Sequence, residues 1–108
     1  MIFVKIMPKK FHKVEPVASL NEFMAKARLV ESFTSSNGRR YLVTGIDDDE
    51  MLFRRLDAEE SKEWSMNLKN VFRAYQELED FATINFKPFV PITHSPARGL
   101  LLHLGMLV

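Results

Sequence analysis

The sequence predicts a small α+β domain, in which a three- to four-stranded antiparallel sheet, a meander, packs against two or three helices. An Asn-Gly turn signal lies between two β-forming segments, and amphipathic helical patterns flank the expected strands. The chain has 108 residues, of which 46% are hydrophobic, and this length fits a single domain over 1–108.

The first expected elements are a strand and a helix. Apolar residues alternate over residues 1–7, which is typical of a strand. The S-x-x-E pattern that begins at Ser19 is a capping box, in which Ser and Glu each accept a hydrogen bond from the other's backbone amide. This pattern predicts a short helix near 20–27.

The central part of the chain predicts three consecutive antiparallel strands. Residues 29–33 alternate in polarity, and residues 39–46 are rich in β-forming side chains. The Asn-Gly pair at 37–38 tolerates positive φ at both positions, so a tight hairpin should join these two strands. An acidic second turn at 47–49 leads into a third strand over 51–56.

The next segment leaves two interpretations open. Apolar side chains recur at three- and four-residue steps over 68–79, which predicts an amphipathic helix. In one interpretation this helix begins near residue 58 and includes Trp64 in its apolar stripe, and helix propensity favours it. In the other, residues 63–66 form a short strand and Asn67 caps a helix that starts at 68.

The last third of the chain predicts coil followed by a helix. Phenylalanine and proline residues are spread over 81–94, which we expect to lie on the core as extended coil. Ser95 followed by Pro96 is typical of an N-cap and the first helical position. The final helix should end near Leu104, with Gly105 as its C-terminal stop.

Charge is distributed unevenly along the chain, although the formal net charge is +1. Residues 1–46 carry eight Lys/Arg and three acids, giving +5, whereas residues 47–80 carry five and eleven, giving −6. Such a split can place opposite fields on two faces of the domain. The simpler expectation, which we favour, is that the fold mixes these charges in space.

Basic residues beside aromatic rings are the strongest functional signal. Nucleic-acid surfaces combine cations that neutralise phosphates with rings on which bases stack. The sequence therefore favours a non-enzymatic module that binds nucleic acid, the alternative being that the rings face the core and the arginines lie beside local acids. The candidate residues are Lys9, Lys10, Lys13, Arg39, Arg40, Tyr41, Arg54 and Arg55.

The alternative function is binding of a protein partner, or self-association, through residues 96–108. Seven of the last nine residues are apolar, so this segment is enclosed either by its own domain or by another chain. The candidate interface residues are Leu100, Leu101, Leu104, Met106, Leu107 and Val108.

Motifs for catalysis and cofactor binding are missing from the sequence. It has no Cys, no G-x-S-x-G turn and no cluster of glycines, and the acidic run at 47–50 lacks the spacing of a calcium loop. The E-x-K tripeptide at Glu60 is too common to indicate a nuclease. We expect no metal and no cofactor. A small enzyme is a third hypothesis, which requires His94 or His103 beside a carboxylate in a concave pocket.

The sequence also bears on localisation. No stretch approaches the ~20 apolar residues that a membrane-spanning helix needs. In residues 1–10 the apolar residues precede the basic ones, which is the reverse of a secretory signal peptide. We therefore expect a cytoplasmic protein that does not insert into a membrane.

Overall fold

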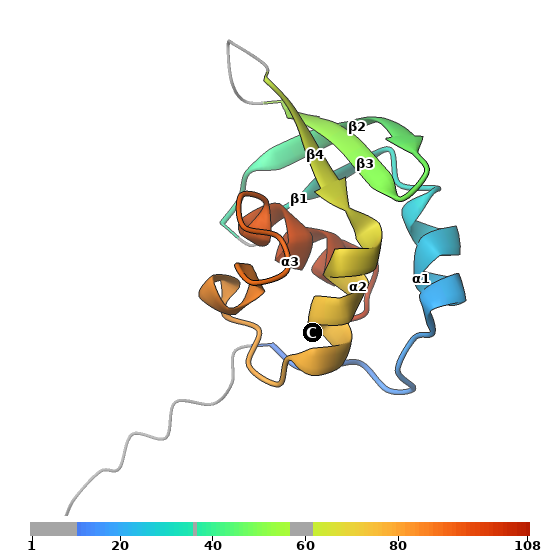
Figure 1. The fold of residues 1–108 in the computed structure, drawn as a ribbon, viewed down its shortest axis with the longest axis vertical. Helices are drawn as coiled ribbons and strands as arrows, with labels where there is room; N and C mark the ends of the chain where they lie inside the picture. Colours follow the sequence, from blue (N-terminus) through green and yellow to red (C-terminus); the bar gives the residue numbers. More distant parts are fainter. Residues whose placement is uncertain (1–10, 36, 57–61) are drawn as a thin grey trace, which may run out of the picture.

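The computed structural model describes residues 11–35, 37–56 and 62–108 and confirms the α+β fold class. Its four-stranded antiparallel meander, in the order β1-β2-β3-β4, lies against three helices (Figure 1). The predicted strand over 1–7 lies outside the described residues. The elements are α1 (Leu20–Ala27), β1 (Ser32–Thr34), β2 (Arg40–Asp47), β3 (Glu50–Arg55), β4 (Glu63–Asn67), α2 (Leu68–Glu77), the 3-10 helix η1 (Thr83–Phe86) and α3 (His94–His103).

Helix α1 begins at the predicted capping box. Ser19 Oγ accepts a hydrogen bond from the Glu22 amide at 3.2 Å, and the Glu22 carboxylate accepts one from the Ser19 amide at 3.4 Å. The buried face of α1 includes Phe23, whose ring centroid lies 5.6 Å from that of Phe72 on α2. The cap therefore fixes the start of a helix that the aromatic contact holds against α2.

Strand β1 starts later than predicted because the chain first completes the end of α1. The amides of Leu29 and Val30 donate to Lys26 O and Ala27 O, at 3.1 and 3.2 Å. Since these donors are used by the helix terminus, the paired strand begins only at Ser32.

The first hairpin is confirmed, but its turn differs from the expected one. Gly38 has a φ of 87°. The Ser35 amide donates to Arg39 O at 2.7 Å, so three residues rather than two lie between the paired positions. This pairing differs from the tight turn that the Asn-Gly pair predicts, while the left-handed conformation of Gly38 agrees with that prediction.

Strand β4 settles the two interpretations of the next segment. Residues 63–67 pair with β3, and the Asn67 Oδ1 caps α2 by accepting from the Asn70 amide at 3.0 Å. The short-strand interpretation is confirmed, and the long helix that propensity favoured is wrong. Pairing with β3 leaves the Met66 side chain 1% exposed, and this tertiary burial outweighs local propensity.

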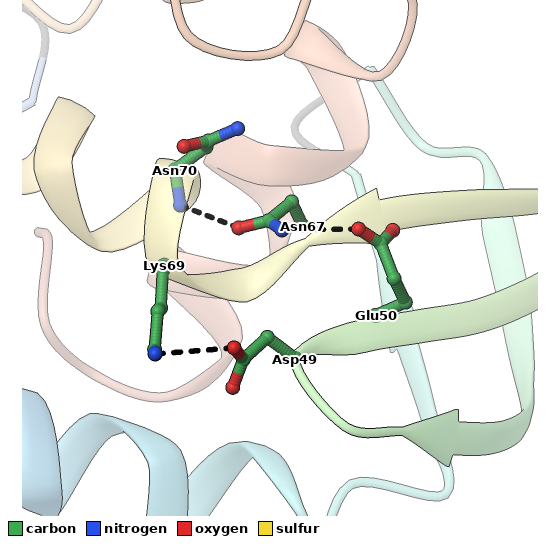
Figure 2. A network of polar contacts seen from close by, with 5 residues as sticks. All are labelled: Asp49, Glu50, Asn67, Lys69 and Asn70. Atoms are coloured by element: carbon green, nitrogen blue, oxygen red, sulfur yellow. Dashed lines mark hydrogen bonds and ion pairs between the residues drawn. The ribbon is translucent and has the colours of Figure 1, made fainter.

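A polar network joins the acidic β2–β3 turn to the start of α2, as Figure 2 shows. Lys69 Nζ lies 3.2 Å from Asp49 Oδ2, and the Asn67 side-chain amide donates to Glu50 Oε1 at 3.0 Å. The Leu68 amide donates to Asp49 O at 2.7 Å. Asp49 and Glu50 of the acidic run thus hold the sheet to the start of α2. These contacts give the two acidic residues a structural role that does not involve a metal ion.

The segment before α3 is not wholly extended. It contains η1, which places Phe86 in the core together with Phe81. Helix α3 starts at His94, and Ser95 therefore lies within its first turn instead of capping it. A proline is accepted anywhere in the first turn, since those amides have no partner within the helix, so Pro96 did not mark the first position.

The C-terminal end of α3 follows the prediction. Gly105 has a φ of 73°, its amide donates to Leu102 O at 3.1 Å, and the Met106 amide donates to Leu101 O at 3.0 Å. These two bonds are those of a Schellman motif, which ends helices at a left-handed glycine.

A close backbone approach fixes α3 against the sheet. A Cβ added at Gly99 would lie 2.7 Å from Ser35 Cα and 3.2 Å from Thr34 O, both of them backbone atoms. Only glycine therefore allows this separation between α3 and the end of β1. The contact holds α3 against the end of β1, on the face of the sheet that the helices cover.

Candidate functional site

The β2–β3 hairpin carries opposite charges at its two ends. Arg40 starts β2 and Arg55 ends β3, while Asp47 and Glu50 are paired beside the turn at the other end. The eight residues of β2 separate these ends by roughly 25 Å at ~3.4 Å per residue. Arg54 and Arg55 come from the acidic stretch 47–80 and lie beside Arg40 of the basic stretch 1–46, so the fold mixes the two stretches here, as expected.

The four arginines at this end alternate between the two faces of the sheet. Arg40 pairs with Thr34 and Arg54 pairs with Leu42, all on the exposed outer face. Arg55 pairs with the buried Tyr41 on the inner face, and Arg39, two residues before Tyr41, lies on that side too. We call this set of Arg39, Arg40, Arg54 and Arg55 the basic end.

One carboxylate offsets part of this charge. Glu63 Oε2 lies 3.9 Å from Arg54 Nε and accepts a hydrogen bond from Thr44 Oγ1 at 3.0 Å. Both members of the ion pair are about half exposed, with 49% and 44% of their side chains accessible. Such a pair holds its side chains weakly, so Arg54 stays able to exchange it for a phosphate.

A cavity of about 250 Å³ lies at the basic end, between the inner face of the sheet and the first turn of α3. It brings together strand, loop and helix residues that the sequence separates by up to 57 positions. We call it the inner cavity. It is lined by Arg39, Tyr41, Phe53, Arg55, Trp64, Ile92, Thr93, His94, Ser95 and Pro96.

Aromatic rings form the wall of the inner cavity on the sheet side. Tyr41 and Phe53 are buried and meet edge to face, with centroids 5.3 Å apart and ring planes at 89°. Trp64 is half-buried and lies directly opposite Phe53 on β4. Lys62 Nζ lies 4.9 Å from the Trp64 centroid, which adds a cation beside the cavity.

The opposite wall carries an imidazole and two hydroxyl groups. His94 Nδ1 makes a hydrogen bond of 3.1 Å with Pro91 O, which orients the imidazole at the start of α3. Thr93 is buried and Ser95 is half-buried beside it. Among the described residues that line the cavity, the two arginines are the basic side chains and none is Asp or Glu.

The structure does not bring every predicted basic residue to this site. Lys13 donates from Nζ to Gln76 O at 3.0 Å, and its ammonium lies 5.3 Å from the Tyr75 ring centroid. These contacts hold it near the C-terminal end of α2, and this end of the helix lies away from the sheet in Figure 1. Lys9 and Lys10 lie outside the described residues.

The candidate interface residues near the C-terminus mostly belong to the core of this chain. Leu100, Leu101, Met106 and Leu107 are at most 3% exposed, Leu104 is half-buried, and Val108 is 72% exposed. Residues 106–108 pair with 12–14, through bonds such as the His12 amide to Val108 O at 2.7 Å. Of the two explanations for the apolar segment, enclosure by its own domain accounts for the four buried side chains.

The enzyme hypothesis requires either His94 or His103 beside a carboxylate in a concave pocket. His94 lies in the inner cavity, whose described lining contains no carboxylate, and His103 is exposed in a shallow depression that also contains Glu31. Within residues 11–35, 37–56 and 62–108 no group of three His, Asp or Glu side chains is placed to hold a metal ion.

Comparison with known proteins adds no relative. No protein-family model, no curated protein and no solved structure matches the chain. In the part of the chain that the structure describes, no helix has the length and apolar character that crossing a membrane requires. The functional argument therefore rests on the basic end and the inner cavity.

Of the ten residues that line the inner cavity, only Arg39, Tyr41 and Arg55 were among the predicted binding residues. Trp64, Thr93 and Ser95 were not among the candidate residues, because no local pattern connects them to the arginines. The strand interpretation of 63–66 contained one usable signal, since alternation places Trp64 on the same face as the buried Met66.

Proposed function

We propose that this protein is a non-enzymatic module that binds nucleic acid at the basic end of its sheet, in the cytoplasm. The observation that carries the proposal is the meeting of four arginines at one end of a hairpin, with the half-buried Trp64 beside them. Arginine presents a planar donor fork that fits two phosphate oxygens, and aromatic rings provide surfaces for bases.

The arrangement of charge favours one way of docking. Carboxylates occupy the far end of the hairpin, and Asp47 and Asp48 are exposed there. A polyanion is attracted to one end and repelled from the other, so it approaches the arginines end-on. An acidic protein would meet the same field, but it offers fewer planar rings for the aromatic wall of the inner cavity.

Salt dependence tests this proposal. We expect fluorescence anisotropy of a labelled single-stranded oligonucleotide to rise with protein concentration. If four phosphates are neutralised, the slope of log K against log salt should be about −2.8, at roughly −0.7 per phosphate. A slope near zero, or no binding at low salt, would remove the proposed function.

A further inference from the structure

We propose that residues 1–7 of this chain dock as an added strand on the free edge of β4, beside the segment that precedes α3. Strand β4 is the last in the order β1-β2-β3-β4, and within residues 11–35, 37–56 and 62–108 no strand pairs with its other edge. The docking site is independent of nucleic-acid binding, because none of the four arginines of the basic end lines it.

The backbone of β4 has groups available for such a strand. The Leu68 amide donates to Asp49 O at 2.7 Å, so these two residues form a hydrogen-bonded pair at the end of the β3–β4 ladder. Hydrogen-bonded pairs alternate with non-hydrogen-bonded ones in an antiparallel ladder, so Met66 and Trp64 also direct their backbone groups to β3. The N–H and C=O groups of Ser65 therefore point to the free edge. Natural proteins protect such an edge, because it can pair with another chain.

A groove of about 400 Å³ lies along this edge, and we call it the edge groove. Residues 62–67 form one side of it, and residues 89–93 with Asn70 form the other. Its apolar lining includes the half-buried rings of Trp64 and Phe89, and Ile92 is 72% exposed beside them. An apolar strand face placed here would remove this surface from water, which favours docking.

Residues 1–7 have the pattern that a strand in the edge groove requires. The β-branched side chains of Ile2, Val4 and Ile6 fall on one face of an extended segment. This face matches the apolar lining of the groove. Lys5 then falls on the opposite face, which continues the outer face of the sheet where Glu63 is exposed. Opposite charges on neighbouring strands stabilise their pairing.

The attachment point of the segment lies near the groove. The ring centroid of Phe11, the first described residue, is 4.7 Å from Arg98 Cζ. Helix α3 begins at His94, about 6 Å before Arg98 at ~1.5 Å per residue, and Thr93 just before this start lines the groove. Residues 1–10 can extend over up to ~33 Å, which is ample for this offset. A segment tethered so closely has an effective concentration in the millimolar range, which favours it over a second copy at micromolar protein concentration.

Amide hydrogen exchange at Ser65 tests the proposal on the full chain. Ser65 is exposed, so its amide should exchange freely unless a strand covers the edge. If residues 1–7 are docked about 90% of the time or more, this exchange should be at least ~10-fold slower than that of an unprotected amide. The Trp64 amide faces β3, so its protection in every variant confirms that the sheet is intact.

Two neighbouring residues of the segment provide the matched control. Val4→Asn places a polar side chain against the apolar lining of the groove, whereas Phe3→Asn places the same side chain on the outer face. Val4→Asn should restore fast exchange at Ser65, with a gain of ~10-fold or more, and should shift the emission of Trp64, the only tryptophan, to longer wavelength. Phe3→Asn should change the Ser65 rate by less than about threefold, as expected for a surface substitution.

Four results would overturn the proposal. The first is fast exchange at Ser65 in the wild type, and the second is an equal effect of the two asparagine substitutions. The third is slow exchange at Ser65 that Val4→Asn leaves unchanged, because another occupant would then cover the edge. The fourth is protection that increases with protein concentration together with a dimer mass in sedimentation equilibrium, which would make a second copy the occupant.

Discussion

Reversing the charge of the basic end should reduce oligonucleotide affinity by a factor on the order of 10² to 10³ at 0.1 M salt. Replacing Arg39, Arg40, Arg54 and Arg55 with Glu removes four phosphate contacts. Each contact contributes roughly −0.7 to the slope of log K against log salt concentration. Losing four contacts therefore removes about −2.8 from this slope. Anisotropy titrations of the wild type and this variant, at equal ionic strength, measure the difference.

The matched control changes the net charge equally at other sites. Lys26, Arg28, Arg73 and Lys87 are exposed and lie outside the basic end and the inner cavity. Replacing them with Glu should weaken binding by less than ~10-fold, since only the long-range field changes. Equal losses in both quadruple variants would mean that net charge, and not the basic end, drives the association.

Phe53→Ala should cost about 3–5 kcal/mol in the free energy of unfolding. The side chain is fully buried, and its ring meets those of Tyr41 and Phe33 at centroid distances of 5.3 and 5.8 Å. Truncation removes the apolar transfer free energy and leaves a cavity between sheet and helices. Since domains are typically stable by ~5–15 kcal/mol, the variant should be close to unfolding at 25 °C.

Urea denaturation measures this loss. The midpoint should fall strongly for Phe53→Ala, while Leu29→Ala should stay within ~0.5 kcal/mol of the wild type because the Leu29 side chain is 82% exposed. A cost below ~1 kcal/mol for Phe53→Ala would contradict the placement of this ring at the centre of the inner face.

Local signals predicted much of this fold. The capping box at Ser19 set the start of α1, the turn near Gly38 set the first hairpin, and Gly105 ended α3. Each acts through a few neighbouring residues, so its effect can be read from the sequence. The strand 63–67 could not be decided in this way, because it depends on pairing with β3, and the start of α3 at His94 depends on packing.

The candidate site was predicted in part. Arg39, Arg40, Arg54 and Arg55 were predicted as binding residues, and the structure brings them together because a hairpin places the start of one strand beside the end of the next. Their separation onto two faces follows from strand alternation and the register. The helix side of the inner cavity depends on the close approach between Gly99 of α3 and the end of β1. No local sequence pattern indicates this tertiary contact.

Chemical-shift mapping with a short single strand tests the central claim most directly. Amide shifts should change at residues 38–41 and 54–55, at 93–95 and at the Trp64 indole N–H, and should stay constant at the acidic turn 47–50. This pattern would place the nucleic acid at the basic end. Changes confined to 47–50 or to the C-terminal residues 106–108, or no changes when anisotropy shows saturation, would contradict the account.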